Sequence, residues 1–373
     1  MEQVRPYRFA VGKAAIADLH ARLDAARWPE RECVDDWSQG VPLAALRDFV
    51  AHWRHRHDWS AGEAWLNAQG LSETVIDGLA IRFLHIKSPR SDAHPLILSH
   101  GWPGSVFEFR DCIAALTDPA APIAFHCVIP CLPGYGLSDK PSRHGWGVER
   151  IACAWGTLMA RLGYDRWFAQ GGDWGAVVTT AIAVQNLPGC QGIHLNMPIA
   201  RPIPEDLADP APDAARALAA LQHYRDHDSG YSTQQRTRPQ TIGYALVDSP
   251  LALAAWIYEK MWAWTDNTGM PESALGRDAM CDNLSLYWFT ASGASSARLY
   301  WESFGSFAPQ PITLPVACSA FPKEILPAPR AWVERHCRNL VHWGEMPRGG
   351  HFAAWEQPDL FVGELRTAFA QMV

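Results

Sequence analysis

The sequence RWFAQGGDWG (residues 166–175), followed by AVVTTAIAVQ (176–185), decides the fold of this chain. Its first five residues form a short run typical of a buried strand, and residues 176–185 have the composition of a buried helix. The segment GGDWG joins the two, with small residues around one carboxylate. Glycines let a chain turn sharply from strand to helix and expose the central side chain. The pattern predicts that Asp173 is a nucleophile, with an ordinary helix N-cap as the alternative.

Short apolar runs alternate with helical patterns on both sides of this turn, which is typical of a parallel sheet with crossover helices. Strands are expected at His94–Ser99, Phe125–Cys131, Arg166–Gln170, Cys190–Leu195, Ile312–Ala320 and Leu340–Trp343, and helices at Glu149–Leu162, Ala176–Gln185 and Pro358–Met372. Residues 201–310 interrupt the alternation with Ala-rich and Trp-rich helical patterns. We therefore predict an α/β protein with a mostly parallel sheet, flanking helices and a helical lid insertion.

The N-terminal part has a different pattern. Ala14–Arg27 and Pro42–Arg54 carry apolar residues at helical spacing, and Asp77-Gly78 suits the turn of a β-hairpin. This predicts an N-terminal helical extension that precedes the sheet. The expected units are an extension at 1–92 that wraps the core, a core at 93–200 and 311–373, and a helical lid at 201–310.

The segment HGWPGS (100–105) follows the strand expected at 94–99. Hydrolases with such a strand–turn–helix nucleophile bind the oxyanion with the amide after the nucleophile and one amide from an early loop. Here these would be the amides of Trp174 and Trp102. Trp102, Pro103 and Trp174 are also expected to form part of the substrate pocket, with a cis peptide bond before Pro103. His100 is predicted to brace the loop.

Two further segments supply a base and an acid. RGGHF (348–352) places His351 on a glycine loop after the last expected strand, and FPKEI (321–325) places Glu324 after the preceding one. The chain order nucleophile, acid, histidine is that of α/β hydrolases. Glu324 would orient the imidazole and stabilise its charged form. Asp248 and Asp266 in the insertion are the alternative acids.

A carboxylate nucleophile indicates displacement at saturated carbon, because the ester it forms can be hydrolysed by an activated water. Epoxides and haloalkanes are the two substrate classes. An epoxide oxygen leaves as an alkoxide and needs an acidic O–H donor, which a lid tyrosine can supply. The insertion contains Tyr224, Tyr231, Tyr244, Tyr258, Tyr287 and Tyr300.

The chain resembles the microsomal-type epoxide hydrolases, which include the juvenile-hormone epoxide hydrolases. The resemblance covers most of the chain and rests on five motifs in the family's order: HGWPGS, GGDWG, GYSTQQRTRPQTIGYALVDSP (230–250), FPKEI and RGGHFAAWEQP (348–358). It implies the α/β-hydrolase fold with an N-terminal extension. It makes Asp173 the nucleophile, His351 the base and Glu324 the orienting acid, with Tyr231 and, on a looser match in RLYWE (298–302), Tyr300 as lid acids. The other lid tyrosines are expected in the core or the pocket wall.

Two other functions stay open at this point. A haloalkane dehalogenase could use Asp173 and His351 unchanged, with Trp102 and Trp174 around the halide. A catalytically silent protein could enclose an apolar ligand under the lid. A serine esterase is disfavoured because no serine occupies the turn.

Composition narrows the partners and the location. The net charge of −7 and the absence of a basic stripe argue against nucleic acid. The nine cysteines form no C-x-x-C pair, which indicates a reducing compartment, and the N-terminus lacks an apolar leader or anchor. We therefore expect a cytoplasmic enzyme without a membrane span that acts on a small apolar epoxide. No metal or organic cofactor is expected, and homodimerisation is left open.

Overall fold

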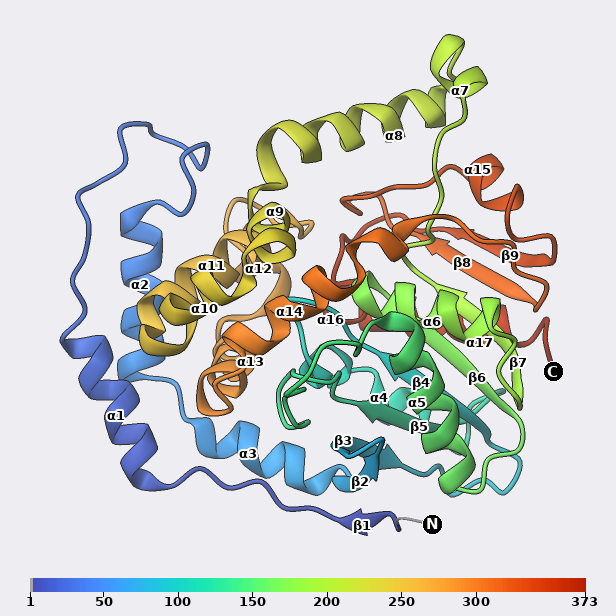
Figure 1. Cartoon of the computed structure of the whole chain (residues 1–373), viewed down its shortest axis with the longest axis horizontal. Coiled ribbons are helices and arrows are strands. Elements are labelled where there is room, and N and C mark those ends of the chain that lie inside the picture. The colour runs from blue at the N-terminus through green and yellow to red at the C-terminus, as the bar shows by residue number, and fades with distance from the viewer. Residues whose placement is uncertain (1–2) are drawn as a thin grey trace.

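The computed structural model describes residues 3–373, and a single sheet of nine strands runs through this part of the chain (Figure 1). The order across the sheet is β1-β2-β3-β5-β4-β6-β7-β8-β9. The strands are β1 Arg5–Pro6, β2 Ser72–Ile76, β3 Leu79–Ile86, β4 His94–Ser99, β5 Phe125–Pro130, β6 Trp167–Gly171, β7 Cys190–Leu195, β8 Val316–Ala320 and β9 Leu340–Glu345. Strands β4 to β9 pair in parallel, while β1, β2 and β3 add an antiparallel edge. The predicted mostly parallel sheet is confirmed.

Helices cover both faces of the sheet. Alternate residues of β4 show this, because Ile97 packs in one buried cluster with helix α5 while Leu96 and Leu98 pack in the other with helix α17. The helices of the core are α4 Ile113–Leu116, α5 Val148–Arg161, α6 Asp173–Val184, α15 Arg330–Glu334, α16 Ala353–Glu356 and α17 Pro358–Phe369. The core is therefore a layer of strands between two layers of helices.

Between β7 and β8 the chain leaves the sheet and forms a group of helices (Figure 1). They are α7 Pro204–Ala208, α8 Pro212–His223, a π-helical turn at Tyr224–Asp228, α9 Gly230–Thr237, α10 Pro239–Asp248, α11 Pro250–Ala263, α12 Glu272–Leu275, α13 Arg277–Phe289 and α14 Gly293–Ser303. The predicted helical character of this segment is confirmed.

The N-terminal helices α1 Lys13–Asp24, α2 Leu43–His55 and α3 Trp59–Ala68 lie beside the inserted helices (Figure 1). The ring of Phe49 lies 4.6 Å from that of Tyr258, and Trp53 Nε1 donates to Ser285 Oγ at 2.8 Å. The extension therefore supports the insertion as well as the sheet. Along residues 3–373, no helix combines the length and the apolar character needed to cross a bilayer.

Several local expectations were wrong, and three of them concern the site or its surroundings. Helix α6 begins at Asp173 and not at Ala176, because the turn passes directly into the helix. Strand β8 begins at Val316 and not at Ile312, which forms only an isolated bridge, since Pro311 and Pro315 cannot donate to a ladder. Tyr244, expected in the core or the pocket wall, is 70% exposed.

Candidate active site

The GGDWG segment places Asp173 at the end of β6 in a left-handed backbone conformation, with φ of 49°. Aspartate tolerates this region better than most residues do. The turn is tightly packed, because a Cβ on Gly171 would meet the carbonyl of Gly175 and one on Gly175 would meet that of Ser99. These contacts explain why small residues surround the carboxylate, and they agree with the predicted strand–turn–helix nucleophile.

The two carboxylate oxygens of Asp173 have different neighbours. Oδ1 accepts a hydrogen bond of 2.8 Å from the backbone N–H of Trp102, and Oδ2 lies 3.4 Å from Nε2 of His351. The side chain is 14% exposed. One oxygen is therefore bound by an amide that was predicted for an oxyanion hole, and the other faces the predicted base.

His351 and Glu324 are both buried and in contact. Nδ1 of His351 lies 2.9 Å and 3.1 Å from the two carboxylate oxygens of Glu324. Burial alone would lower the pKa of His351, but the charges of Glu324 and Asp173 outweigh it and raise that pKa well above its usual value. Asp173, Glu324 and His351 therefore lie together in the structure, although Asp173 and His351 are 178 positions apart in the sequence.

The alternative acids lie elsewhere. Asp248 is exposed and pairs with Arg22, far along the chain on α1. Asp266 accepts a hydrogen bond of 3.0 Å from the backbone N–H of Gly349, two residues before His351, so it supports the loop and does not contact the imidazole. Glu324 is the carboxylate that touches the ring.

Two phenols from the inserted helices lie beside Trp102 and Trp174, the aromatic neighbours of Asp173. Tyr231 on α9 stacks on Trp102 with ring centroids 5.0 Å apart, and Tyr300 on α14 meets Trp174 edge to face at 4.8 Å. The Tyr300 hydroxyl has no hydrogen-bond partner within the described chain, whereas Tyr231 Oη accepts from Tyr224 Oη at 3.2 Å. Burial, together with nearby negative charge, raises both pKa values well above the usual one. Both groups are therefore neutral donors.

The loop after β4 also matches its predicted geometry. The Trp102–Pro103 peptide bond is cis. His100 is buried, its Nε2 accepts from the backbone N–H of Leu132 at 3.2 Å, and burial lowers its pKa to about 4. His100 is therefore neutral and braces the loop, as expected.

Sequence reasoning missed Glu108. It borders a cavity of about 20 Å³ that Asp173 and His351 also line. Burial raises the pKa of Glu108 to about 8, and the charge of His351 opposes that shift. The signal that the sequence offers is the Ser105-x-x-Glu108 spacing of a helix-capping box, which by itself indicates only a local role. A cavity of this size accommodates about one water molecule.

Lys260 was also missed. Its Nζ lies 4.9 Å from the centre of the Tyr231 ring and 2.6 Å from Oδ1 of Asp228. The other oxygen of Asp228, Oδ2, accepts from Trp264 Nε1. A cation over a phenol ring stabilises negative charge developing on its oxygen. No local motif marked this lysine, because it lies mid-helix in α11.

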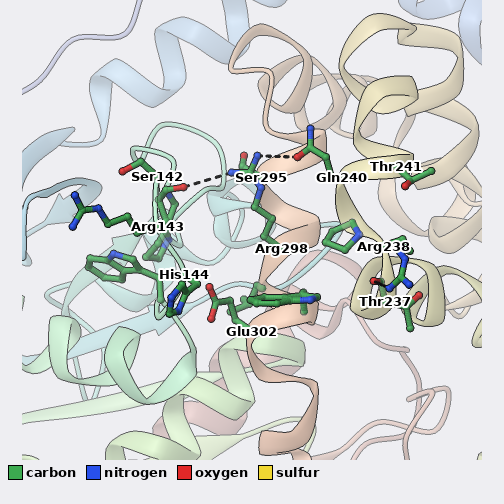
Figure 2. A pocket seen from close by; sticks show the side chains of 16 residues that line it. Ser142, Arg143, His144, Thr237, Arg238, Gln240, Thr241, Ser295, Arg298 and Glu302 are labelled. Carbon is green, nitrogen blue, oxygen red and sulfur yellow. Dashed lines mark hydrogen bonds between the residues drawn. The ribbon is translucent and has the colours of Figure 1, made fainter.

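A larger cavity of about 440 Å³ lies between the loop 141–146 and helices α10 and α14 (Figure 2). Arg298 spans it and donates to Gln240 Oε1 at 3.3 Å. None of the candidate site residues, all of which belong to the described chain, lines this cavity. It is therefore distinct from the site around Asp173.

Known proteins resemble this chain along nearly its whole length. The family model "Epoxide hydrolase N terminus" matches residues 4–109, and "alpha/beta hydrolase fold" matches residues 94–237. A Stigmatella aurantiaca protein that carries a provisional epoxide hydrolase name is 54% identical over 375 residues, which are 99% of this chain and 85% of that protein. Epoxide hydrolase 1 of Oryctolagus cuniculus is 33% identical over 403 residues, 98% and 88% of the two chains.

Two solved structures superpose along nearly the whole length. The epoxide hydrolase of Aspergillus niger has a TM-score of 0.89 and 30% identity, covering 99% of this chain and 96% of its own. The juvenile hormone epoxide hydrolase of the silkworm Bombyx mori has a TM-score of 0.91 and 29% identity, covering 100% and 95%.

Proposed function

This chain belongs to the epoxide hydrolase family, with the α/β-hydrolase fold, and we propose that it opens its substrate through an ester on Asp173. The observation that carries the proposal is the position of Asp173. Its carboxylate lies at a strained turn, with Oδ2 beside His351 and two buried phenols above its aromatic neighbours. The resting site therefore holds a nucleophile, a base and two acids.

In the first step Oδ2 of Asp173 attacks an epoxide carbon. A new C–O ester bond forms while the ring C–O bond breaks, and the electron pair moves to the ring oxygen. Tyr231 and Tyr300 donate to this oxygen, and one phenol gives it a proton. Because burial raises the pKa of both phenols, a phenolate does not persist and takes a proton from the imidazolium of His351.

The second step regenerates the carboxylate. Esterification removes the charge of Asp173, so the pKa of His351 falls and its neutral form becomes available. His351, held by Glu324, takes a proton from water, and the hydroxide adds to the ester carbonyl carbon. The Trp102 amide, which already binds Oδ1, stabilises the tetrahedral oxyanion together with the amide of Trp174. The bond between the carbonyl carbon and Oδ2 then breaks, so Oδ2 leaves with the product. The departing alkoxide takes the proton of the new Asp173 carboxylic acid, which gives the diol and returns Asp173 as a carboxylate beside the His351 imidazolium.

The small cavity beside Glu108 is the proposed position of the attacking water. Its volume of about 20 Å³ and its contact with both Asp173 and His351 support this assignment. Protonated Glu108 can donate to the water oxygen while His351 accepts the water proton. Glu108 is thus a proposed positioning residue for the hydrolytic step.

The experiment is one turnover in ¹⁸O-labelled water with enzyme in excess. The ester route leaves the first diol unlabelled and carries the label into the peptide that contains Asp173. Direct attack of water on the epoxide would label the first diol and leave that peptide unlabelled. The latter result would refute the ester on Asp173.

Three further parts of the proposal concern the surroundings of the site. Residues 201–310 act as a lid over a core formed by residues 93–200 and 311–373. The aromatic contacts of α9 and α14 with the core support this role. Residues 1–92 wrap around the core. The aromatic walls favour a small apolar epoxide, and the two phenols disfavour halide as a leaving group. Nine free cysteines support a cytoplasmic location.

A further inference from the structure

A second cavity adjoins the two phenols from the side of the π-helical turn. It has a volume of about 420 Å³, within the range of about 300–1,000 Å³ that is usual for small-molecule sites. Tyr224 and Phe307 belong to its wall. Tyr224 Oη donates to Tyr231 Oη at 3.2 Å, and the ring of Phe307 lies 5.0 Å from that of Trp174. The cavity is thus separated from the reacting groups by single side chains.

Most of the remaining wall is apolar. It includes Met197, Ile199, Leu221, Phe304 and Leu326. Phe304 also packs against Tyr300, with ring centroids 6.4 Å apart. A wall of this kind stabilises an apolar chain through the hydrophobic effect. It fits the non-reacting part of a substrate whose epoxide lies between Tyr231 and Tyr300.

The charged residues of the wall are all positive. Arg201, Arg225 and Arg236 line the cavity, and no aspartate or glutamate does so among the described residues. Arg236 lies 5.2 Å from the centre of the Phe304 ring, and Arg225 donates only to Gln222, at 3.5 Å. Within residues 3–373 none of the three forms an ion pair. The polar side of this cavity is therefore positively charged and exposed to solvent, although the chain as a whole has a net charge of −7.

The cavity of Figure 2 provides a contrast. It also contains arginines, but Glu302 lies among them and accepts from the backbone N–H of Gly145 at 2.9 Å. Arg298 there is already bound to Gln240 and to the carbonyl of Pro141. Tyr224, Phe304 and Phe307, which connect the other cavity with the phenols, do not line that cavity. The wall of that cavity thus includes a carboxylate, whereas the wall beside Tyr224 includes none among the described residues.

We propose that the substrate is an epoxide on an apolar chain that ends in a carboxylate. The epoxide lies between the phenols, the chain follows the apolar wall past Phe304 and Phe307, and the carboxylate lies among Arg201, Arg225 and Arg236. Guanidinium groups suit this partner, because they bind carboxylates with two parallel hydrogen bonds. The inference rests on the proposed function and adds the substrate class to it.

The test compares two substrates that differ only in charge: a medium-chain fatty acid with a terminal epoxide and its primary amide. The acid should show about tenfold higher kcat/KM at low salt, the scale of a few partly exposed ion pairs. Added NaCl should remove this preference, because salt screens exposed charges. The amide should respond little to salt.

Variants then locate the effect. The triple variant Arg201→Gln, Arg225→Gln, Arg236→Gln should lower kcat/KM for the acid to that of the amide and leave the amide unchanged. Each single variant should lose about two- to fivefold for the acid alone. Arg338→Gln, an exposed arginine outside the cavity, is the matched control and should change neither substrate. The single variants and the salt titration decide the question if the triple variant does not fold.

The outcomes separate this inference from the proposed function. If the enzyme hydrolyses acid and amide equally, or if the preference survives in the triple variant, the carboxylate site is wrong while the epoxide hydrolase mechanism stands. If it hydrolyses only a compact neutral epoxide such as styrene oxide, the substrate class is also wrong. If no epoxide forms an ester on Asp173, the proposed function itself fails.

Discussion

The phenol rings of Tyr231 and Tyr300 meet edge to face, with centroids 5.8 Å apart and planes at 81°. They come from different helices of the insertion, α9 and α14, and both are buried. Two donors at one position can share the oxygen of an opening epoxide. In the proposed mechanism neither phenol is then indispensable alone, and the two together carry the leaving-group step.

Replacing these phenols should therefore slow formation of the ester. Tyr231→Phe and Tyr300→Phe should each reduce the single-turnover alkylation rate by about 10²–10³-fold, the scale of one lost oxyanion donor. The double variant should be nearly inactive in this step, while hydrolysis of an ester already formed should change little. Rapid quench or tryptophan fluorescence measures both phases. Alkylation at the wild-type rate in the double variant would remove the phenols as acids.

Loss of the nucleophile should abolish turnover without loss of the fold. Asp173→Ala removes the attacking oxygen, so diol formation should fall to background. The backbone at this position has φ of 49°, which disfavours alanine by about 1–2 kcal/mol, so only a modest decrease in melting temperature is expected. Diol chromatography and circular dichroism make the two measurements. Substantial turnover by the folded variant would show that Asp173 is not the nucleophile.

Loss of the base should stop the reaction halfway. In His351→Gln, Asp173 can still attack, but the water that cleaves the ester is no longer activated. An alkyl-enzyme ester should accumulate, and mass spectrometry should find it on the peptide that contains Asp173. The proposal fails if this variant accumulates no adduct and yet turns over normally.

The orienting acid should matter less than either group that reacts. Glu324→Gln should lower the pKa of His351, because one of the two carboxylates that raise it is removed, and should reduce turnover less than His351→Gln does. Imidazole NMR titration measures the pKa. Asp266→Asn is the matched control, since the Asp266 carboxylate accepts from the loop backbone at Gly349 beside His351. Equal effects of the two variants would point away from Glu324.

Glu108 should make stability depend on pH. Its folded pKa is raised to about 8 from an ordinary value of 4.5, so the folded state binds the proton more tightly than the unfolded state. Stability should fall as pH rises between these values, because the unfolded chain can ionise Glu108 while the folded protein must keep it protonated. Above about pH 8 the folded protein holds a buried charge. Glu108→Gln should melt at a higher temperature than wild type at pH 9 and at the same temperature at pH 4. A constant difference across this range would contradict the assignment.

The fold class and the position of the candidate nucleophile could be predicted from local sequence, because each depends on neighbouring residues. The GGDWG turn specifies a strand, a strained residue and a helix within a few positions, and β4 and β7 had the predicted bounds because apolar runs report short buried strands directly. The bounds of α6 and β8 differed, since a helix start and the first ladder hydrogen bond depend on backbone geometry that composition does not report.

The sequence by itself determined the α/β class, the order Asp173, Glu324, His351 and the helical nature of the insertion. Only the tertiary structure decided which distant side chains meet. It placed Glu108 at the cavity beside Asp173, left Tyr244 in solvent, and gathered Arg201, Arg225 and Arg236 around one cavity. The physical reason is that periodicity identifies the face of an element that is buried. The partner of that face depends on how the chain returns through space, which local spacing does not encode.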